Sequence, residues 1–154
     1  MPCLRKNGGV TRTSSPTLPA HLRPRNIWLV FVGGVLGVLA REALLLVVPD
    51  SAGLPIAVCV ANLSGAFLLG LLLESLARLG PETELRSAMR LLLGTGLLGG
   101  FTTYSALAQA LVVLSAEGAI WLAVGYGLGT VLLGAVASWF GVLLGSRVGR
   151  GGDA

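Results

Sequence analysis

The feature that most constrains this chain is a glycine- and hydroxyl-rich segment in the middle of a long apolar run. The run covers residues 91–114, and the segment inside it extends from Gly94 to Ser105. About 20 apolar residues in a helix cross the hydrocarbon core of a bilayer, so the run predicts a membrane span. Glycines and hydroxyls at mid-span favour a break in the helix. Because carbonyl groups released by a break cannot face lipid, we expect an ion site or a polar path there.

The composition places the chain among membrane proteins and argues against an enzyme. Of 154 residues, 54% are apolar and 12% are charged, whereas a soluble domain carries about 25% charged residues. The two cysteines, Cys3 and Cys59, have no disulfide or metal-binding spacing. His21, the single histidine, stands in a polar tail, which argues against a catalytic triad or a metallohydrolase centre.

Hydropathy predicts an all-α membrane protein with four transmembrane helices between two polar tails. Residues 1–26 are expected to form a disordered basic tail, residues 27–146 the transmembrane domain, and residues 147–154 a short second tail. The first tail lacks the apolar core and cleavage site of a signal peptide. The expected spans are residues 27–48, 55–76, 91–114 and 120–144, joined by a turn at 49–53, a charged connector at 78–90 and a hairpin at 115–118.

Glycines recur at a spacing of four residues within these spans. Such pairs let helix backbones approach closely, although a glycine-rich composition could produce them without a role. A four-helix chain of this size encloses little space, so we expect it to oligomerise. The pairs are Gly33/Gly37, Gly96/Gly100, Gly125/Gly129 and Gly141/Gly145.

Basic residues are concentrated on one side of the predicted topology. Of the 11 lysines and arginines, ten lie in the two tails and the 78–90 connector, and the opposite loops have none. The positive-inside rule therefore places both termini in the cytoplasm. Nucleic-acid binding is the alternative role for the first tail, but five basic residues over 26 positions are too dilute to favour it.

Two polar side chains within the spans need partners. Arg41 could pair with Glu42, with Glu117 or with backbone carbonyls, and a structural role near the membrane surface is favoured over ion contact. Asn62 is too short to reach the surface. It either joins helices or lines a water-filled path, and the residues alone leave both open.

Hydroxyl groups mark the third and fourth spans. Tyr126 and Thr130 lie one helical turn apart and can form a ladder on one face, and residues 102–105 add hydroxyls at the expected break. Acidic residues are missing from the expected centre of the membrane, which disfavours proton-coupled exchange. Amide, hydroxyl and aromatic-edge donors without fixed negative charge suit an anion better than a cation.

Three motifs resemble those of the Fluc/CrcB fluoride channels. Gly33–Arg41 resembles the family's GGxxGxxxR, Asn62–Gly70 its NxxGsfllG, and Gly96–Leu107 its GxxGGxTTFSTF. The motifs occur in order on the first, second and third spans, and the resemblance covers residues 27–146.

The resemblance implies a channel subunit of the bacterial inner membrane that exports fluoride passively. The family forms antiparallel dimers in the lipid bilayer, with two pores along the interface. A structural Na⁺ at the dimer centre would be held by the backbone carbonyls of Gly99 and Thr102. Structural roles fall on Gly33, Gly37 and Arg41. Pore-lining positions fall on Asn62, Thr103, Tyr104, Ser105, Leu107, Tyr126 and Thr130.

The chain departs from the family pattern in its pore. Tyr104 and Leu107 occupy the positions of two phenylalanines, and Gly134 occupies a position that usually carries a hydroxyl. An antiparallel homodimer also needs a weak charge bias, because one sequence must insert both ways, and the bias here is strong. We therefore expect a heterodimer with a related subunit of opposite orientation.

Two other functions are alternatives to the channel. A small dual-topology multidrug exchanger has a similar size and four helices, and it requires an acidic residue in the first span, for which Glu42 is the candidate. A membrane assembly protein without transport activity leaves the interrupted third span unexplained.

Overall fold

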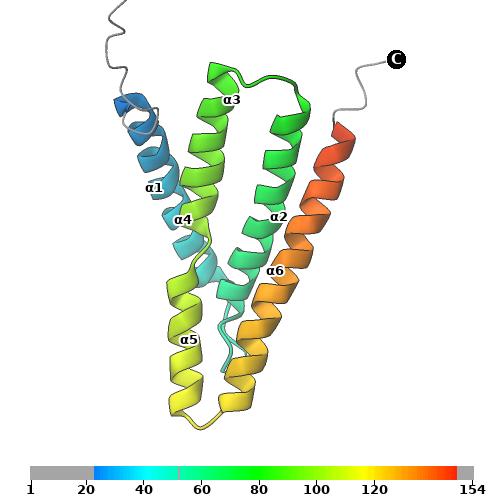
Figure 1. The fold of residues 1–154 in the computed structure, drawn as a ribbon. Coiled ribbons are helices and arrows are strands. Elements are labelled where there is room, and N and C mark those ends of the chain that lie inside the picture. The colour runs from blue at the N-terminus through cyan, green and yellow to red at the C-terminus, as the bar shows by residue number, and fades with distance from the viewer. Residues whose placement is uncertain (1–22, 52, 149–154) are drawn as a thin grey trace, which may run out of the picture.

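The computed structural model describes residues 23–51 and 53–148, which form a bundle of long helices (Figure 1). Four helical stretches are long and apolar enough to cross a membrane, which confirms the prediction of an all-α, multi-pass membrane protein. The third stretch is assembled from α3, a π-helical segment η2, α4 and α5. The elements are α1 (Pro24–Val47), α2 (Ile56–Arg78), α3 (Glu84–Met89), η2 (Arg90–Leu98), α4 (Gly99–Phe101), α5 (Tyr104–Ala116) and α6 (Ile120–Val148).

The basic residues gather at one end of the bundle. Figure 1 shows the start of α1, the whole of α3 and the end of α6 at this end, with the α1–α2 and α5–α6 loops at the other. Among the described residues, every arginine except Arg41 belongs to the first end. The acidic Asp50 and Glu117 lie in the loops of the second end. The charge bias along the sequence is therefore a difference between the two ends of the bundle.

Several predicted boundaries shift because helices extend into polar segments. The predicted connector at 78–90 is helical from Glu84 onward, since Thr83 caps α3 by accepting a hydrogen bond from the Arg86 amide at 3.3 Å. Residues 24–26, assigned to the tail, form the first turn of α1, where proline at the first position suits a helix start. Residues 146–148 continue α6. The remaining tail residues, 1–22 and 149–154, lie outside the described part.

Two glycine pairs bring α1 against the third span. A Cβ atom on Gly33 would lie 2.2 Å from the Leu92 carbonyl oxygen, and one on Gly37 would lie 2.1 Å from the Leu97 carbonyl oxygen. Gly96 and Gly100 face α1 in the same way, at 2.8 and 2.5 Å from its carbonyl oxygens. The two backbones are thus in direct contact, and no side chain fits between them.

A second backbone contact joins α2 to α6. A Cβ atom on Gly141 would lie 2.1 Å from the Phe67 carbonyl oxygen, and one on Gly70 would lie 2.3 Å from the Ser138 carbonyl oxygen. Gly145 also faces α2. The Gly125/Gly129 pair differs, because added Cβ atoms there would meet nothing within 4 Å. This pair therefore makes no close helix contact within the described residues, so three of the four pairs serve helix packing here.

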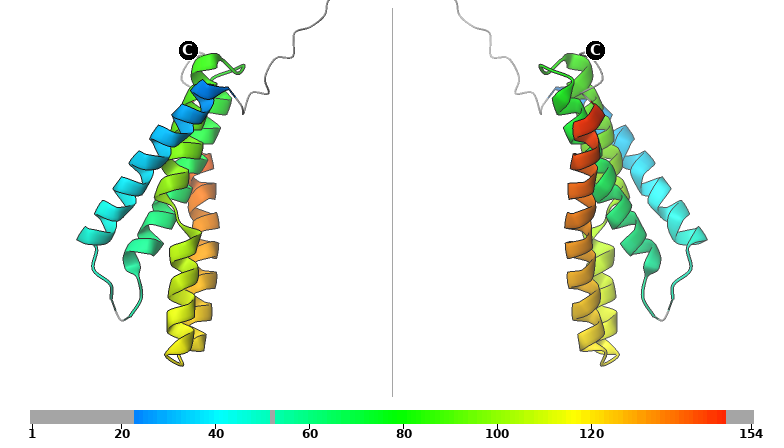
Figure 2. Two further views of the ribbon diagram at one scale, coloured as in Figure 1. Left: turned by 90° about the vertical axis from the view of Figure 1, so that its left-hand side faces the viewer. Right: turned by 90° about the vertical axis from the view of Figure 1, so that its right-hand side faces the viewer.

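The third span is π-helical around Gly94 and Gly96, and its backbone leaves the helical conformation at two threonines. Thr102 (φ −79°, ψ 151°) and Thr103 (φ −146°, ψ 122°) have extended backbones between α4 and α5. Gly94 and Gly96 lie within η2 and Gly99 begins α4, so the glycines stay helical. The small size of Gly96 and Gly100 serves the contact with α1. Below the extended residues the C-terminal end of α1 diverges from α5 and α6 (Figure 2).

Candidate functional site

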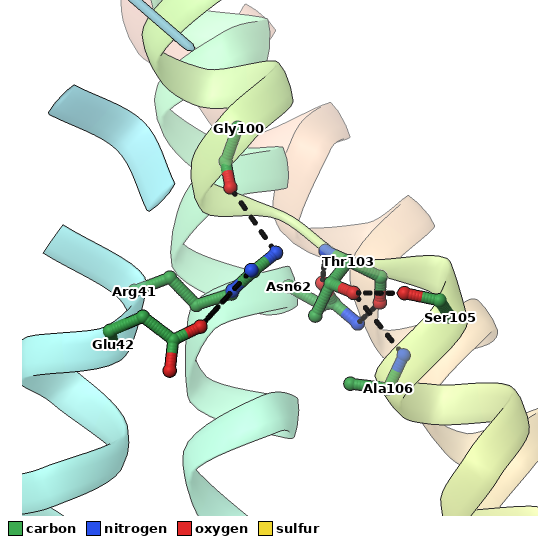
Figure 3. Close-up of polar contacts among 7 residues, drawn as sticks. All are labelled: Arg41, Glu42, Asn62, Gly100, Thr103, Ser105 and Ala106. Atoms are coloured by element: carbon green, nitrogen blue, oxygen red, sulfur yellow. Dashed lines mark hydrogen bonds and ion pairs between the residues drawn. The ribbon is translucent and has the colours of Figure 1, made fainter. Parts of the chain in front are cut away.

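Asn62 of α2 and the backbone of Thr103 form a closed pair of hydrogen bonds. Asn62 Nδ2 donates to the Thr103 carbonyl oxygen at 3.0 Å, and the Thr103 amide donates to Asn62 Oδ1 at 2.8 Å (Figure 3). The side-chain amide thus acts as a second peptide group beside the extended chain. Because a carboxamide carries two N–H groups and two lone pairs on oxygen, one N–H of Asn62 remains available.

Two carbonyl groups of the third span lose their helical donors beside this pair. In a continuous helix the Thr103 amide would donate to the carbonyl of Gly99, but it donates to Asn62 instead. The Ala106 amide would donate to Thr102, but it donates to Thr103 Oγ1 at 3.2 Å and so caps α5. The carbonyls of Gly99 and Thr102 therefore both lose the helical donor four residues further along the chain.

Both the hydroxyl and the methyl group of Thr102 make contacts that hold the side chain in place. Its Oγ1 donates to the Leu98 carbonyl oxygen at 2.9 Å, one turn back in the same span. Its methyl group lies against α2, where a Cβ atom on Gly65 would come within 2.3 Å of it. Gly65 is one turn along from Asn62, so one face of α2 supports both extended threonines.

A groove of about 600 Å³ lies beside Thr102 and Thr103 and is lined by residues of α2, the third span and α6. It gathers five of the seven residues predicted to line a pore, together with Gly99 and Thr102, the two predicted to bind sodium. Ser105 and Tyr126 are not among its lining residues. The groove is lined among others by Asn62, Thr95, Gly99, Thr102, Thr103, Tyr104, Leu107, Thr130 and Gly134.

Exposure differs sharply among the groove residues. Thr103 and Thr130 are 7% and 6% exposed, and Leu107 is also buried. Tyr104 is 81% exposed although it lies in the middle of a membrane span. Ser105 is exposed too, and its Oγ lies 3.1 Å from Thr103 Oγ1. Two threonines and Leu107 thus form the buried base of the groove, and Tyr104 lies at its exposed rim.

The hydroxyls of Tyr126 and Thr130 both donate to carbonyl groups. Thr130 Oγ1 donates to the Tyr126 carbonyl oxygen at 2.8 Å, within α6. Tyr126 Oη donates to the carbonyl oxygen of Pro55 at 2.9 Å, and this contact ties α6 to the start of α2. Both protons are therefore committed in this conformation.

Arg41 reaches from α1 to the same region. Its Nη1 donates to the Gly100 carbonyl oxygen at 3.4 Å, and its Nη2 lies 3.1 Å from Glu42 Oε1 (Figure 3). Of the partners considered from sequence, the structure thus supplies Glu42 and a backbone carbonyl. Gly33 and Gly37 lie on the same helix and hold it against η2 and α4.

Sequence reasoning missed two parts of this site. The supporting role of Gly65 could have been found from the Asn62–Gly65 spacing, which puts both residues on one helix face. The role of the Pro55 carbonyl as acceptor for Tyr126 left no sequence signal, because the two residues are 71 positions apart. Among the described residues, no group of three His, Cys, Asp or Glu side chains could hold a metal. A cation here would depend on backbone oxygen.

Comparison with known proteins identifies the family. Residues 28–142 match the family described as CrcB-like protein, Camphor Resistance (CrcB). The chain belongs to this family. It is 46% identical over 143 residues to the fluoride-specific ion channel FluC 2 of Leifsonia xyli subsp. xyli, covering 91% of this chain and 95% of the relative.

Two further relatives have similar descriptions. The fluoride-specific ion channel FluC 1 of Cutibacterium acnes is 46% identical over 121 residues, covering 76% of this chain and 82% of the relative. The fluoride-specific ion channel FluC of Gloeobacter violaceus is 44% identical over 118 residues, covering 75% and 91%. The resemblance read from three motifs is therefore confirmed, and so is the expectation that the chain is not an enzyme. The multidrug exchanger finds no support among these relatives.

Proposed function

We propose that the chain is a subunit of a fluoride-selective ion channel and that the groove beside Asn62 and Thr103 is its half of a pore. The observation that carries the proposal is the arrangement at this groove, where an amide and several hydroxyls meet an extended stretch of a membrane-spanning chain. The names of the relatives add the choice of ion. No carboxylate is among the lining residues, which suits an anion.

A fluoride ion would be bound by the donors that remain free. The second N–H of Asn62 is one, and the Tyr104 hydroxyl, which has no hydrogen-bond partner among the described residues, is another. One of the Thr103 and Ser105 hydroxyls donates a hydrogen bond to the other, so the accepting hydroxyl keeps a free O–H group. Thr130 would have to turn away from the Tyr126 carbonyl before it could donate. These donors would offset the loss of water around the ion.

We further propose that a structural sodium ion binds the carbonyl oxygens of Gly99 and Thr102. The fit is chemical, because both groups are hard oxygen donors and both lack their helical hydrogen-bond partner. Two oxygens do not complete the coordination of a cation, so a second subunit would supply the others. The ion would provide a fixed positive charge near the crossing of the subunits, and this charge would hold the extended residues in place.

The proposed transport is passive export through the bacterial inner membrane, with both termini in the cytoplasm. The end of the bundle that carries the arginines would face the cytoplasm. An inside-negative membrane potential favours exit of an anion by about 2.3 kcal/mol per 100 mV. Glu42, the residue that an exchanger would require, is paired with Arg41 and its side chain is 58% exposed.

The assembly that we propose is an antiparallel dimer with a related subunit of opposite orientation. An open groove and a largely exposed Tyr104 support the need for a second subunit. The strong charge difference between the two ends of the bundle favours a distinct partner over a second copy.

Fluoride efflux from liposomes tests the proposal. The purified chain, alone and co-purified with its partner, is reconstituted in vesicles loaded with potassium fluoride, and release is recorded with a fluoride electrode after a potassium ionophore is added. We expect electrogenic fluoride release from the pair and little release from the single chain. Vesicles loaded with chloride serve as the selectivity control, and they should release little.

A further inference from the structure

Arg90 lies at the end of the groove that is nearest the arginine-rich end of the bundle. It is the first residue of η2 and precedes Gly94, which lines the groove, by one helical turn. A Cβ atom on Gly94 would lie 4.0 Å from Cγ of Arg90 and 3.7 Å from the side chain of Leu69, a lining residue of α2. The Arg90 side chain is 48% exposed. A positive charge in contact with water therefore stands beside the end of the groove.

Glu82 supplies a counter-charge from the connector between α2 and α3. Its Oε2 accepts a hydrogen bond from Nη2 of Arg90, and its side chain is 53% exposed. The connector turns at Gly80, whose φ of 102° favours glycine, and Arg86 Nη1 donates to the Pro81 carbonyl oxygen at 2.6 Å. Because these contacts hold the carboxylate in place, an incoming ion meets the charge of Arg90 reduced by that of Glu82.

Arg90 keeps hydrogen-bond donors while it is paired. A guanidinium carries five N–H groups, and among the described residues only Nη2 of the Arg90 side chain has a partner. The group stays charged at any pH that the cell reaches. Asn62 lies seven residues deeper along α2 than Leu69. An ion that enters from this end therefore meets the guanidinium before it meets the amide proposed to bind fluoride.

The other paired arginines of this end lie farther from the groove along their helices. Arg25 pairs with Glu84 at 2.6 Å and so joins α1 to α3, on the α1 side of the third span. Arg78 pairs within α2, about 14 Å beyond the last residue of that helix that lines the groove. Arg90 is thus the paired arginine that stands within one turn of a lining residue.

We propose that Arg90 draws anions to this end of the groove and that Glu82 limits the attraction by pairing with it. The inference rests on the channel proposed above, because it assigns the supply of fluoride to that groove. A charge at the mouth of a cleft raises the local concentration of ions of opposite sign, and salt screens this effect. Removing the guanidinium should therefore slow fluoride entry, and removing the carboxylate should speed it.

Fluoride efflux at two ionic strengths tests the role of the pair. The assembled protein is reconstituted at less than one copy per vesicle on average, and vesicles that display a C-terminal tag outside are removed on an affinity resin. Since α6 ends at the arginine-rich end, this end faces the lumen of the protein-containing vesicles that remain (Figure 1). Fluoride is loaded at a concentration at which the wild-type rate still rises with fluoride.

At about 10 mM ionic strength, where charges act over about 30 Å, we expect Arg90→Gln to lower the initial rate about twofold and Glu82→Gln to raise it about twofold. Arg90→Lys keeps the charge and should keep the wild-type rate. At about 1 M, where the range is about 3 Å, these proteins should release fluoride equally fast. Arg25→Gln and Glu84→Gln are the matched controls, because they make the same charge changes on the α1 side, and they should change the rate much less.

Three results would overturn the role of Arg90. One is an equal rate for the wild type and Arg90→Gln at low ionic strength. Another is a loss that persists at about 1 M, because salt does not screen a structural defect. The third is an equal loss for Arg25→Gln, which would make the attraction a property of the whole end. A rate that does not rise in Glu82→Gln would overturn the limiting role of the carboxylate.

A second measurement reads the local potential without transport. Thr95→Cys, in protein whose Cys3 and Cys59 are replaced by alanine, places a thiol at an exposed, groove-lining position five residues beyond Arg90. The thiol is modified by methanethiosulfonates that carry either a negative sulfonate or a positive trimethylammonium group. At about 10 mM ionic strength, the ratio of the negative to the positive reagent's rate should fall about fourfold with Arg90→Gln and rise with Glu82→Gln.

The two measurements separate this inference from the channel. The expected thiol ratios without fluoride efflux from the wild-type pair would refute the channel alone. Efflux that does not change with Arg90→Gln would refute the inference alone. A thiol at position 95 that neither reagent modifies, or a ratio that does not depend on Arg90, would also overturn the inference, because the groove end would then lack either water or the proposed potential.

Discussion

Asn62 and Thr103 hold each other through two opposed hydrogen bonds, of 3.0 Å from the side-chain amide and 2.8 Å to it. The pair satisfies the backbone of an extended residue inside a membrane span, where an unpaired amide or carbonyl would be costly. The same pair takes the Thr103 amide away from Gly99. One side chain of α2 thus both stabilises the extended segment and exposes the oxygen proposed to bind a cation.

Replacing Asn62 by aspartate tests this double role. Asn62→Asp removes the donor to the Thr103 carbonyl and places a carboxylate beside it, so we expect a loss of about 1–3 kcal/mol in stability. We also expect fluoride flux to fall at least tenfold, because negative charge would stand beside an anion path. Ser64→Ala is the control, since Ser64 bonds to carbonyls of its own helix. Normal flux from well-assembled Asn62→Asp protein would contradict the pore assignment.

The contact between α1 and the third span predicts that alanine substitutions at two glycines of α1 differ in their effect on stability. Gly37→Ala places a methyl group 2.1 Å from the Leu97 carbonyl oxygen, so the helices must separate, and we expect a loss of about 1–3 kcal/mol. Gly34→Ala meets nothing within 4 Å and should be neutral or slightly stabilising. Thermal unfolding in detergent measures both. Equal melting temperatures for the two variants would mean that the close approach is absent.

Gly65 and Thr102 should be coupled. Gly65→Ala brings a methyl group against the Thr102 methyl, at 2.3 Å in the present geometry, and should destabilise the protein. Thr102→Ser removes the opposing methyl but keeps the hydroxyl that donates to Leu98. The double variant should therefore recover most of the stability lost in Gly65→Ala. A double-mutant cycle on melting temperature checks this, and strictly additive effects would show that the side chains do not touch.

The four spans could be predicted from hydropathy because each is a long apolar run, but their polar ends could not. The start of α3 depends on the capping hydroxyl of Thr83 inside a charged segment that reads as a loop. The spacing of Gly96 and Gly100 indicates a close helix contact, but no local pattern reveals that α1 is the helix they meet. The extended backbone of Thr103 could not be predicted, because it is stabilised by Asn62, 41 positions away.

The proposed sodium site predicts a bound ion that survives buffer exchange. Dimeric protein purified in sodium chloride and then exchanged exhaustively into potassium buffer should retain about one sodium ion per dimer by elemental analysis. The reason is that carbonyl oxygens buried at a subunit crossing exchange their ion slowly. Sodium no higher than in the exchange buffer would argue against an ion at Gly99 and Thr102.

The charge difference between the two ends of the bundle predicts a single orientation for this chain. A tag at the C-terminus should be accessible only from the cytoplasmic side of intact cells, because the basic end resists translocation. Protease protection of spheroplasts measures this. A tag found on both membrane faces, together with stable dimers of the single chain, would contradict the proposed heterodimer.

Fluoride efflux from vesicles that contain the chain and its oppositely oriented partner tests the central claim most directly. The account predicts rapid fluoride release once an ionophore carries the counter-charge, negligible chloride release, and loss of fluoride release with Asn62→Asp. Vesicles that retain fluoride with both the single chain and the assembled pair, or that release chloride as fast as fluoride, would contradict it.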